Sequence, residues 1–246
     1  MVEVSNLEFA AGGKTLCSRL SFSLSRGNIM AVLGPNGRGK TTLLRTLLGA
    51  HRASAGRVCF AAHAACVPQH SATIFSYDVL TMVTLGRSRH LRWYQSPGEH
   101  DIDVARSCLE IFQLAHLAKQ PFNALSGGEK QLVTIAQAIA SDSPILILDE
   151  PASALDLSNQ NIVLSALRRL ARERNITIIF TTHHPQHAQH IADYTLLLFP
   201  QAENAFDRTQ NVCTDAHLTR LYGLPVRVAS LPQDNRRIDY AIPVFS

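Results

Sequence analysis

Four short apolar runs dominate the hydrophobic pattern of this chain. Each has the length of a strand: IMAVL (29–33), ILIL (145–148), TIIF (177–180) and TLLLF (195–199). Uninterrupted apolar runs of this length are typical of strands that are buried on both faces of a parallel sheet. We therefore expect these segments to form the centre of one sheet.

Helical periodicity appears between these runs. Leucines recur at helical spacing in TTLLRTLLGA (41–50), and LSNQNIVLSALRRLARER (157–174) is amphipathic. Strands that alternate with helices indicate a parallel sheet with right-handed crossovers, so the predicted fold class is α/β. Near the N-terminus, VEVSNLEF (2–9) and SFSLS (21–25) alternate apolar and polar residues, as half-buried strands do.

The pattern changes between residues 71 and 125. Apolar residues recur at helical intervals in YDVLTMVTLGR (77–87) and DIDVARSCLEIFQLAHLA (101–118), separated by a polar stretch with Pro and Gly. We expect a single domain over residues 1–246, with a core at 1–70 and 126–200 and an inserted helical subdomain at 71–125. Residues 201–246 form a C-terminal extension to which the weaker pattern assigns no role.

Composition excludes several classes of protein. Hydrophobic residues make up 46% of the 246 residues and charged residues 17%, which is typical of a globular chain. The net charge of +4 comes without a dense Lys/Arg block, which argues against a nucleic-acid partner. The five cysteines contain no C-x-x-C pair, so we expect reduced thiols rather than disulfides or a zinc ribbon. No signal-peptide pattern and no apolar run of about 18 residues is present, so we expect action from outside the bilayer.

Directly after the first apolar run, GPNGRGKTT (34–42) fits the phosphate-loop pattern G-x-x-x-x-G-K-[ST]. Glycines allow consecutive backbone N–H groups to surround phosphates, and the following helix adds the positive end of its dipole. Lys40 would contact the β- and γ-phosphates, and Thr41 would offer its hydroxyl to Mg²⁺. A chance glycine-rich turn is the alternative, which the flanking strand and helix disfavour. The predicted nucleotide-binding residues of this loop are Gly34, Pro35, Asn36, Gly37, Arg38, Gly39, Lys40, Thr41 and Thr42.

A second apolar run, ILIL, ends in two carboxylates, Asp149 and Glu150. Open α/β sheets bind their ligands at the carboxyl ends of the strands, so Asp149 is expected to hold Mg²⁺ beside the phosphates. Glu150 is the candidate general base for the attacking water, and a surface carboxylate that caps the next turn is the alternative. Together these motifs predict an ATPase with ATP and Mg²⁺ as its cofactors.

LSGGE (125–129) lies between the phosphate loop and ILILDE, and PASALD (151–156) follows. With these motifs, residues 2–200 resemble the ATP-binding subunits of ABC transporters. The resemblance implies a P-loop NTPase core with a mainly parallel sheet, a small antiparallel β-subdomain and an inserted helical subdomain. It also implies a head-to-tail dimer, in which each ATP lies between the phosphate loop of one copy and the LSGGx segment of the other.

Further site residues follow from this resemblance, motif by motif. Gln69 in VPQ matches the residue that contacts Mg²⁺ and the attacking water, and Asp156 in SALD matches the segment that communicates across the dimer. His183 in TTH matches the switch histidine, which contacts the γ-phosphate. The segment that binds the γ-phosphate of the partner's ATP is matched by Ser126, Gly127, Gly128 and Glu129.

Three positions depart from the family pattern. The aromatic residue that stacks on adenine is replaced by Ala11, with Phe9 as the nearest ring, so the adenine contact is left open. Arg38 stands where a small residue is usual, which a loop that binds through its backbone tolerates. Glu129 replaces the commoner Gln, and we expect this change to leave the Ser-Gly-Gly contact intact.

YDVLTMVTLGRSRH (77–90) resembles the corresponding region in importers of iron–siderophore complexes, haem, vitamin B12 and related chelates or oxyanions. The short stretch between Gly56 and Gln69, together with FTTHHP (180–185), resembles a molybdate/tungstate branch of this group. The resemblance implies two integral-membrane permease subunits, indirectly a periplasmic or lipoprotein solute-binding protein, and a peripheral place on the cytoplasmic side of the bacterial inner membrane. An ABC exporter ATPase is disfavoured by the importer-like insert, and a soluble DNA-repair or translation ATPase by the short insert and the single cassette.

TTHHPQHAQH (181–190) holds four of the eleven histidines, at His183, His184, His187 and His190. Pro185 suits the first turn of a helix, on which His187 and His190 would share one face. A pair at this spacing could bind Zn²⁺, but the segment has no cysteine and only one carboxylate close by. We expect His183 to act at the phosphates and the other three histidines to lie on a solvated helix start without a function.

Overall fold

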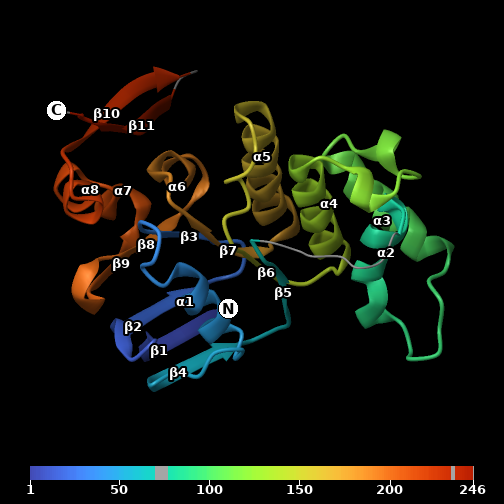
Figure 1. The fold of residues 1–246 in the computed structure, drawn as a ribbon, viewed down its shortest axis with the longest axis horizontal. Coiled ribbons are helices and arrows are strands. Elements are labelled where there is room, and N and C mark those ends of the chain that lie inside the picture. Colours follow the sequence, from blue (N-terminus) through green and yellow to red (C-terminus); the bar gives the residue numbers. More distant parts are fainter. Residues whose placement is uncertain (70–76, 234–235, 246) are drawn as a thin grey trace.

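The computed structural model describes residues 1–69, 77–233 and 236–245. A six-stranded sheet at its centre has the order β5-β6-β7-β3-β8-β9 (Figure 1). Neighbouring strands are parallel except for the antiparallel pair β8 and β9. The strands are β3 (Ile29–Leu33), β5 (Ala64–Val67), β6 (Ile145–Leu148), β7 (Thr177–Thr182), β8 (Tyr194–Leu198) and β9 (Asn204–Arg208). The four predicted apolar strands are confirmed as the adjacent strands β6, β7, β3 and β8, and the α/β fold class is confirmed with them.

Both faces of the sheet are covered, because successive side chains of a strand point to opposite faces. Met30 and Val32 of β3 pack in one cluster with α1 (Lys40–Leu47) and a three-stranded antiparallel sheet of β1 (Val2–Ala11), β2 (Lys14–Leu24) and β4 (Ala55–Phe60). Ile29 and Ala31 pack in a second cluster with the helices of the other face. The small antiparallel sheet was predicted, and it lies beside α1 in Figure 1.

The helices α2 (Val79–Thr84), α3 (Glu99–Ile111) and α4 (Gly127–Ala140) pack against one another at one side of the molecule (Figure 1). The buried guanidinium of Arg87 holds them together, since its Nε donates to Asp101 Oδ1 at 3.0 Å and its Nη1 to the carbonyl oxygen of Ala140 at 3.0 Å. The predicted start of the helical insert near residue 71 lies outside the described residues. Helices α5 (Leu157–Arg174) and α6 (Pro185–Ile191) were both predicted.

The C-terminal extension is folded onto α6. After β9 it forms α7 (Thr209–Val212), α8 (Asp215–Tyr222) and a hairpin of β10 (Val226–Gln233) and β11 (Arg236–Pro243). Gln186 Nε2 donates to the carbonyl oxygen of Ala241 at 2.8 Å, and the Ala241 N–H donates to Gln189 Oε1 at 3.0 Å. The Tyr222 hydroxyl donates to the backbone carbonyl of His183 at 2.8 Å. Across the described residues, every helix is too short or too polar to span a bilayer.

Candidate active site

The loop between β3 and α1 surrounds the ammonium group of Lys40. This side chain is 6% exposed, and its Nζ donates to the carbonyl oxygen of Gly34 at 2.9 Å. Gly39 precedes α1 with a φ of 89°, and a Cβ atom at this position would lie 3.0 Å from the Leu16 side chain. The positive φ favours glycine at this position, and a Cβ atom would also press on the Leu16 side chain. Because the first N–H groups of a helix lack a partner within it, this loop and the start of α1 form a site for an anion.

Asp149 lies directly beside the start of α1. Its Oδ2 accepts a hydrogen bond from Thr41 Oγ1 at 2.6 Å, and its Oδ1 accepts one from Thr181 Oγ1 at 2.6 Å. Gln69 lines a pocket together with Thr41 and Asp149. A hydroxyl, a carboxylate and an amide oxygen are the hard ligands that Mg²⁺ takes, so the three predicted metal ligands lie close together and fit this ion.

Glu150 meets polar groups from three other segments. Its carboxylate lies 3.1 Å from Lys40 Nζ and 3.3 Å from His183 Nδ1, and it accepts a hydrogen bond from Gln69 Nε2 at 3.5 Å. Glu150 is 8% exposed, so it is a buried carboxylate of the site and not a surface residue. The structure therefore brings all three predicted catalytic residues together.

The backbone at Glu150 is strained. Its φ of 49° lies in the left-handed region, which costs a residue other than glycine about 1–3 kcal/mol. The Glu150 N–H donates to Thr181 Oγ1 at 2.8 Å, and the Glu150 carbonyl accepts from Ser153 Oγ at 3.1 Å. These bonds hold the conformation that directs the carboxylate to Lys40. Thr181 was not predicted, because its place at the end of an apolar strand does not show that its hydroxyl joins both carboxylate residues.

The cavity beside the phosphate loop is lined by most of the predicted loop residues. These are Asn36, Gly37, Gly39, Lys40, Thr41 and Thr42, together with Gln69 and Glu150. Ala11, Lys14 and Leu16 of the N-terminal hairpin line it as well. Phe9 has no exposed surface and packs in the core, so it does not replace the missing adenine-stacking ring. Lys14 and Leu16 were missed because nothing in the alternation of β2 marks them as facing a ligand.

The segment Ser126–Glu129 does not line this cavity. Ser126 caps α4, and Glu129 Oε2 accepts hydrogen bonds from the Ser126 N–H at 2.8 Å and from Ser126 Oγ at 2.7 Å. A Cβ atom on Gly128 would lie 3.2 Å from Leu155 Cδ2, so the segment lies against the residue that precedes Asp156, the N-cap of α5. These predicted residues lie outside the cavity, and their action on the ATP of another copy stays a prediction.

Glu129→Ala is expected to lower the free energy of unfolding by about 1 kcal/mol, because it removes the capping box of α4. In a chain of this size that corresponds to a fall in Tm of about 2–4 °C. The hydrogen bonds from Ser126 hold the pKa of the Glu129 carboxyl below its usual range. The ionised carboxylate therefore stabilises the fold at pH values above the pKa that Glu129 has in the unfolded chain, and this stabilisation is lost as the pH falls through the pKa in the folded protein. Thermal unfolding at neutral and acidic pH measures this, with Glu129→Gln as the control that keeps an acceptor. Equal Tm values for Glu129→Ala and the unchanged protein at neutral pH would contradict it.

The expectation of a solvated helix start after His183 is wrong for His187. Helix α6 begins at Pro185 as predicted, but His187 is 8% exposed. Its Nδ1 lies 3.2 Å from Thr182 Oγ1, and its Nε2 lies 3.2 Å from Gln160 Oε1. Burial, with a smaller effect of neighbouring histidines, lowers the pKa of His187 to about 4. Within the described parts of the chain, no three His, Cys, Asp or Glu side chains are grouped so that they could hold a metal ion.

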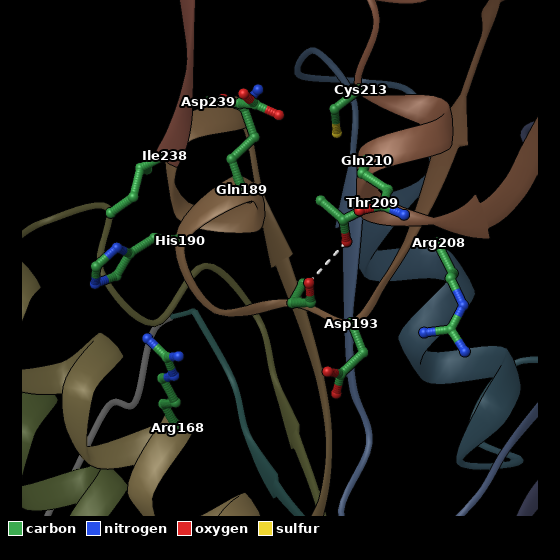
Figure 2. Close-up of a pocket in the computed structure, with 11 residues that line it drawn as sticks. Arg168, Gln189, His190, Asp193, Arg208, Thr209, Gln210, Cys213, Ile238 and Asp239 are labelled. Carbon is green, nitrogen blue, oxygen red and sulfur yellow. Dashed lines mark hydrogen bonds between the residues drawn. The ribbon is translucent and has the colours of Figure 1, made fainter. Parts of the chain in front are cut away.

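A separate cavity lies between α5, α6 and the C-terminal elements (Figure 2). Arg168 and Arg208 line it from opposite sides, and Asp193 and Asp239 line it as well. Asp193 already forms an ion pair with Arg172. The opposite charges of the lining offset each other, and none of the predicted site residues borders this cavity, so it is not the nucleotide site.

Comparisons with known proteins agree with this geometry. The profile of the family described as ABC transporter matches residues 17–153. The molybdate import ATP-binding protein MolC of Haemophilus influenzae is 46% identical over 226 residues, which cover 92% of this chain and 89% of that protein. A solved structure described as an inward-facing metal-chelate type ABC transporter is 42% identical, with a TM-score of 0.92 and coverage of 99% of this chain and 97% of that one. A dimeric ABC cassette bound to ADP and Pi shares the fold at 24% identity, with a TM-score of 0.75 and coverage of 85% and 99%.

Proposed function

Since this chain belongs to the ABC transporter family of ATP-binding subunits, we propose that it hydrolyses ATP to power a bacterial importer of a molybdate-type oxyanion. The observation that carries the proposal is the convergence of Lys40, Thr41, Asp149, Glu150 and His183 at the carboxyl ends of three adjacent parallel strands. This edge of the sheet is where open α/β folds bind and process their ligands.

The chemistry of the site follows from contacts that are already formed. Lys40 exchanges the Glu150 carboxylate for a phosphate oxygen when a nucleotide binds, since both anions compete for one ammonium group. Glu150 then accepts a proton from the attacking water, which Gln69 and His183 orient beside it. Thr41 and Asp149 would hold a Mg²⁺ ion, which would supply positive charge to the transferring phosphoryl group.

A second copy of the chain completes the proposed site. Ser126, Gly127 and Gly128 start α4 away from the phosphate loop of their own chain, and N–H groups at a helix start attract an anion. In a head-to-tail dimer this segment and Asp156 would meet the nucleotide of the partner. Two integral-membrane permease subunits, which the dimer would contact from the cytoplasmic side of the membrane, and indirectly a solute-binding protein, would convert closure of the dimer into transport.

The oxyanion is proposed because the MolC relative is 46% identical over nearly the whole chain. The test is transport by proteoliposomes that contain this chain with the permease and binding protein encoded beside it. We expect ATP-dependent uptake of molybdate or tungstate, with ATP hydrolysis stimulated by the loaded binding protein. ATP hydrolysis with uptake of an iron or haem chelate and not of molybdate would overturn the choice of solute. A complex without ATP hydrolysis would overturn the function itself.

Thr181→Val is expected to shift the Mg²⁺ concentration for half-maximal ATPase activity upwards by about 10- to 100-fold, as other groups that orient a metal ligand do. The reason is that valine cannot hold Asp149 Oδ1, while the shape of the side chain is kept. A Mg²⁺ titration of ATPase activity measures this. Thr177→Val at the start of the same strand is the matched control, since its hydroxyl donates to the Ser25 carbonyl and touches no site residue. Equal titration curves for the two variants would show that Thr181 does not support the metal ligand.

A further inference from the structure

The buried imidazole of His187 joins two segments that the hydrolysis mechanism leaves unconnected. Its Nδ1 lies 3.2 Å from the hydroxyl of Thr182, the residue that directly precedes His183. Its Nε2 lies 3.2 Å from Gln160 Oε1, in the first turn of α5. Gln160 Nε2 in turn donates to the carbonyl oxygen of Leu155 at 2.9 Å, directly before Asp156. We call the side chains of Thr182, His187 and Gln160 the His187 bridge.

The hydrogen-bond directions in the His187 bridge are all compatible with one tautomer. The Gln160 amide donates through Nε2, so its Oε1 is the acceptor for an N–H on His187 Nε2. Nδ1 then accepts the hydroxyl hydrogen of Thr182, whose oxygen accepts from the His184 N–H at 3.0 Å. A neutral imidazole with its hydrogen on Nε2 therefore satisfies every partner. The pKa of about 4 keeps the ring in this neutral form near neutral pH.

His190, the other histidine of α6, does not share these contacts. His190 lines the separate cavity with Arg168. His184, which directly precedes α6, contributes its backbone N–H to Thr182, and its ring lies between those of His183 and His187. The His187 ring links the end of β7 to α5 through its two nitrogens. His190 on the same short helix therefore provides a matched comparison.

We propose that His187 is a positioning residue that couples the switch histidine of one nucleotide site to the Asp156 segment. The inference rests on the proposed function, because the Asp156 segment reaches the second nucleotide only in the head-to-tail dimer. A phosphate that draws His183 away from Glu150 moves the neighbouring Thr182 and His184. The buried bridge then transmits this displacement to the Leu155 carbonyl, and so to the residues that act at the other site.

The test uses the complete transporter in proteoliposomes and measures ATP hydrolysis against ATP concentration. His187→Leu removes both hydrogen bonds, so we expect kcat to fall about fivefold or more, the lower end of measured coupling between sites, and the Hill coefficient to fall to about 1. KM is expected to change less than twofold, since no contact with the nucleotide is lost. His187→Gln keeps one donor and one acceptor and is expected to recover part of the cooperativity. His190→Leu is the control, with wild-type kcat and Hill coefficient.

If His187→Leu does not fold, variants of its two hydrogen-bond partners, Thr182 and Gln160, test the inference instead. Thr182→Val and Gln160→Met each break one end of the bridge, and their effects on the Hill coefficient are expected to be non-additive when combined. Additive effects, or wild-type cooperativity in either variant, would overturn the inference. So would His187→Leu with unchanged kcat and Hill coefficient, or a wild-type transporter that hydrolyses ATP without cooperativity. Failure of the wild type to hydrolyse ATP would instead overturn the proposed function.

Discussion

Glu150→Gln is expected to reduce kcat for ATP hydrolysis by about 10²- to 10⁴-fold, the contribution of a positioned general base, while ATP binding is retained. Glutamine has the size of glutamate and can still contact Lys40, Gln69 and His183, but it cannot accept a proton from water. Single-turnover phosphate release and titration with a fluorescent ATP analogue measure the two effects separately. The retained binding distinguishes a lost base from a damaged phosphate loop.

A carboxylate elsewhere on the surface serves as the control for this change. Glu173 of α5 is exposed, so Glu173→Gln alters the net charge equally and is expected to leave both turnover and binding unchanged. If kcat of Glu150→Gln lies within about tenfold of that of the unchanged protein, the variant has not lost a general base. In that case the carboxylate would act only by holding Lys40, and the attacking water would need another base.

The site was predictable because its residues follow apolar runs, which identify buried parallel strands in the sequence. Lys40, Asp149 and His183 each follow an apolar run, and parallel strands of one sheet end at the same edge. Because β6, β7 and β3 are neighbours in the sheet, residues that are far apart in the sequence lie in one cluster. Glu150 was predicted from its place at the end of β6, but the positive φ that directs its carboxylate to Lys40 has no counterpart in the pattern of apolar and polar residues.

The C-terminal hairpin and the burial of His187 could not be predicted from the pattern of apolar and polar residues. The C-terminal hairpin has one face against the core and one that exposes apolar residues such as Leu231 and Ile242, so its alternation does not separate buried from solvated positions. His187 was misjudged for a related reason. Helical spacing shows that His187 and His190 share a face, but which part of that face is packed depends on α5, which is distant in the sequence.

Lys40→Ala is expected to weaken ATP binding by about 30-fold or more, the usual cost of truncating one partner of a buried charge pair, and to abolish hydrolysis. The same change leaves the Glu150 carboxylate buried without its ammonium partner, so the protein is also expected to be less stable. Nucleotide titration and thermal unfolding without nucleotide measure these two losses. Arg169→Ala, at an exposed position of α5, is the control for the loss of one positive charge.

The double variant Lys40→Ala with Glu150→Gln separates the two losses. Removing the unpaired carboxylate is expected to restore much of the Tm, because an amide is less costly to bury than a charge. It is not expected to restore tight nucleotide binding, since the ammonium that contacts the phosphates is still absent. Recovery of affinity together with Tm would mean that Lys40 serves mainly to neutralise Glu150. Recovery of Tm alone would assign Lys40 to the phosphates, with its ion pair to Glu150 as the contact that the nucleotide replaces.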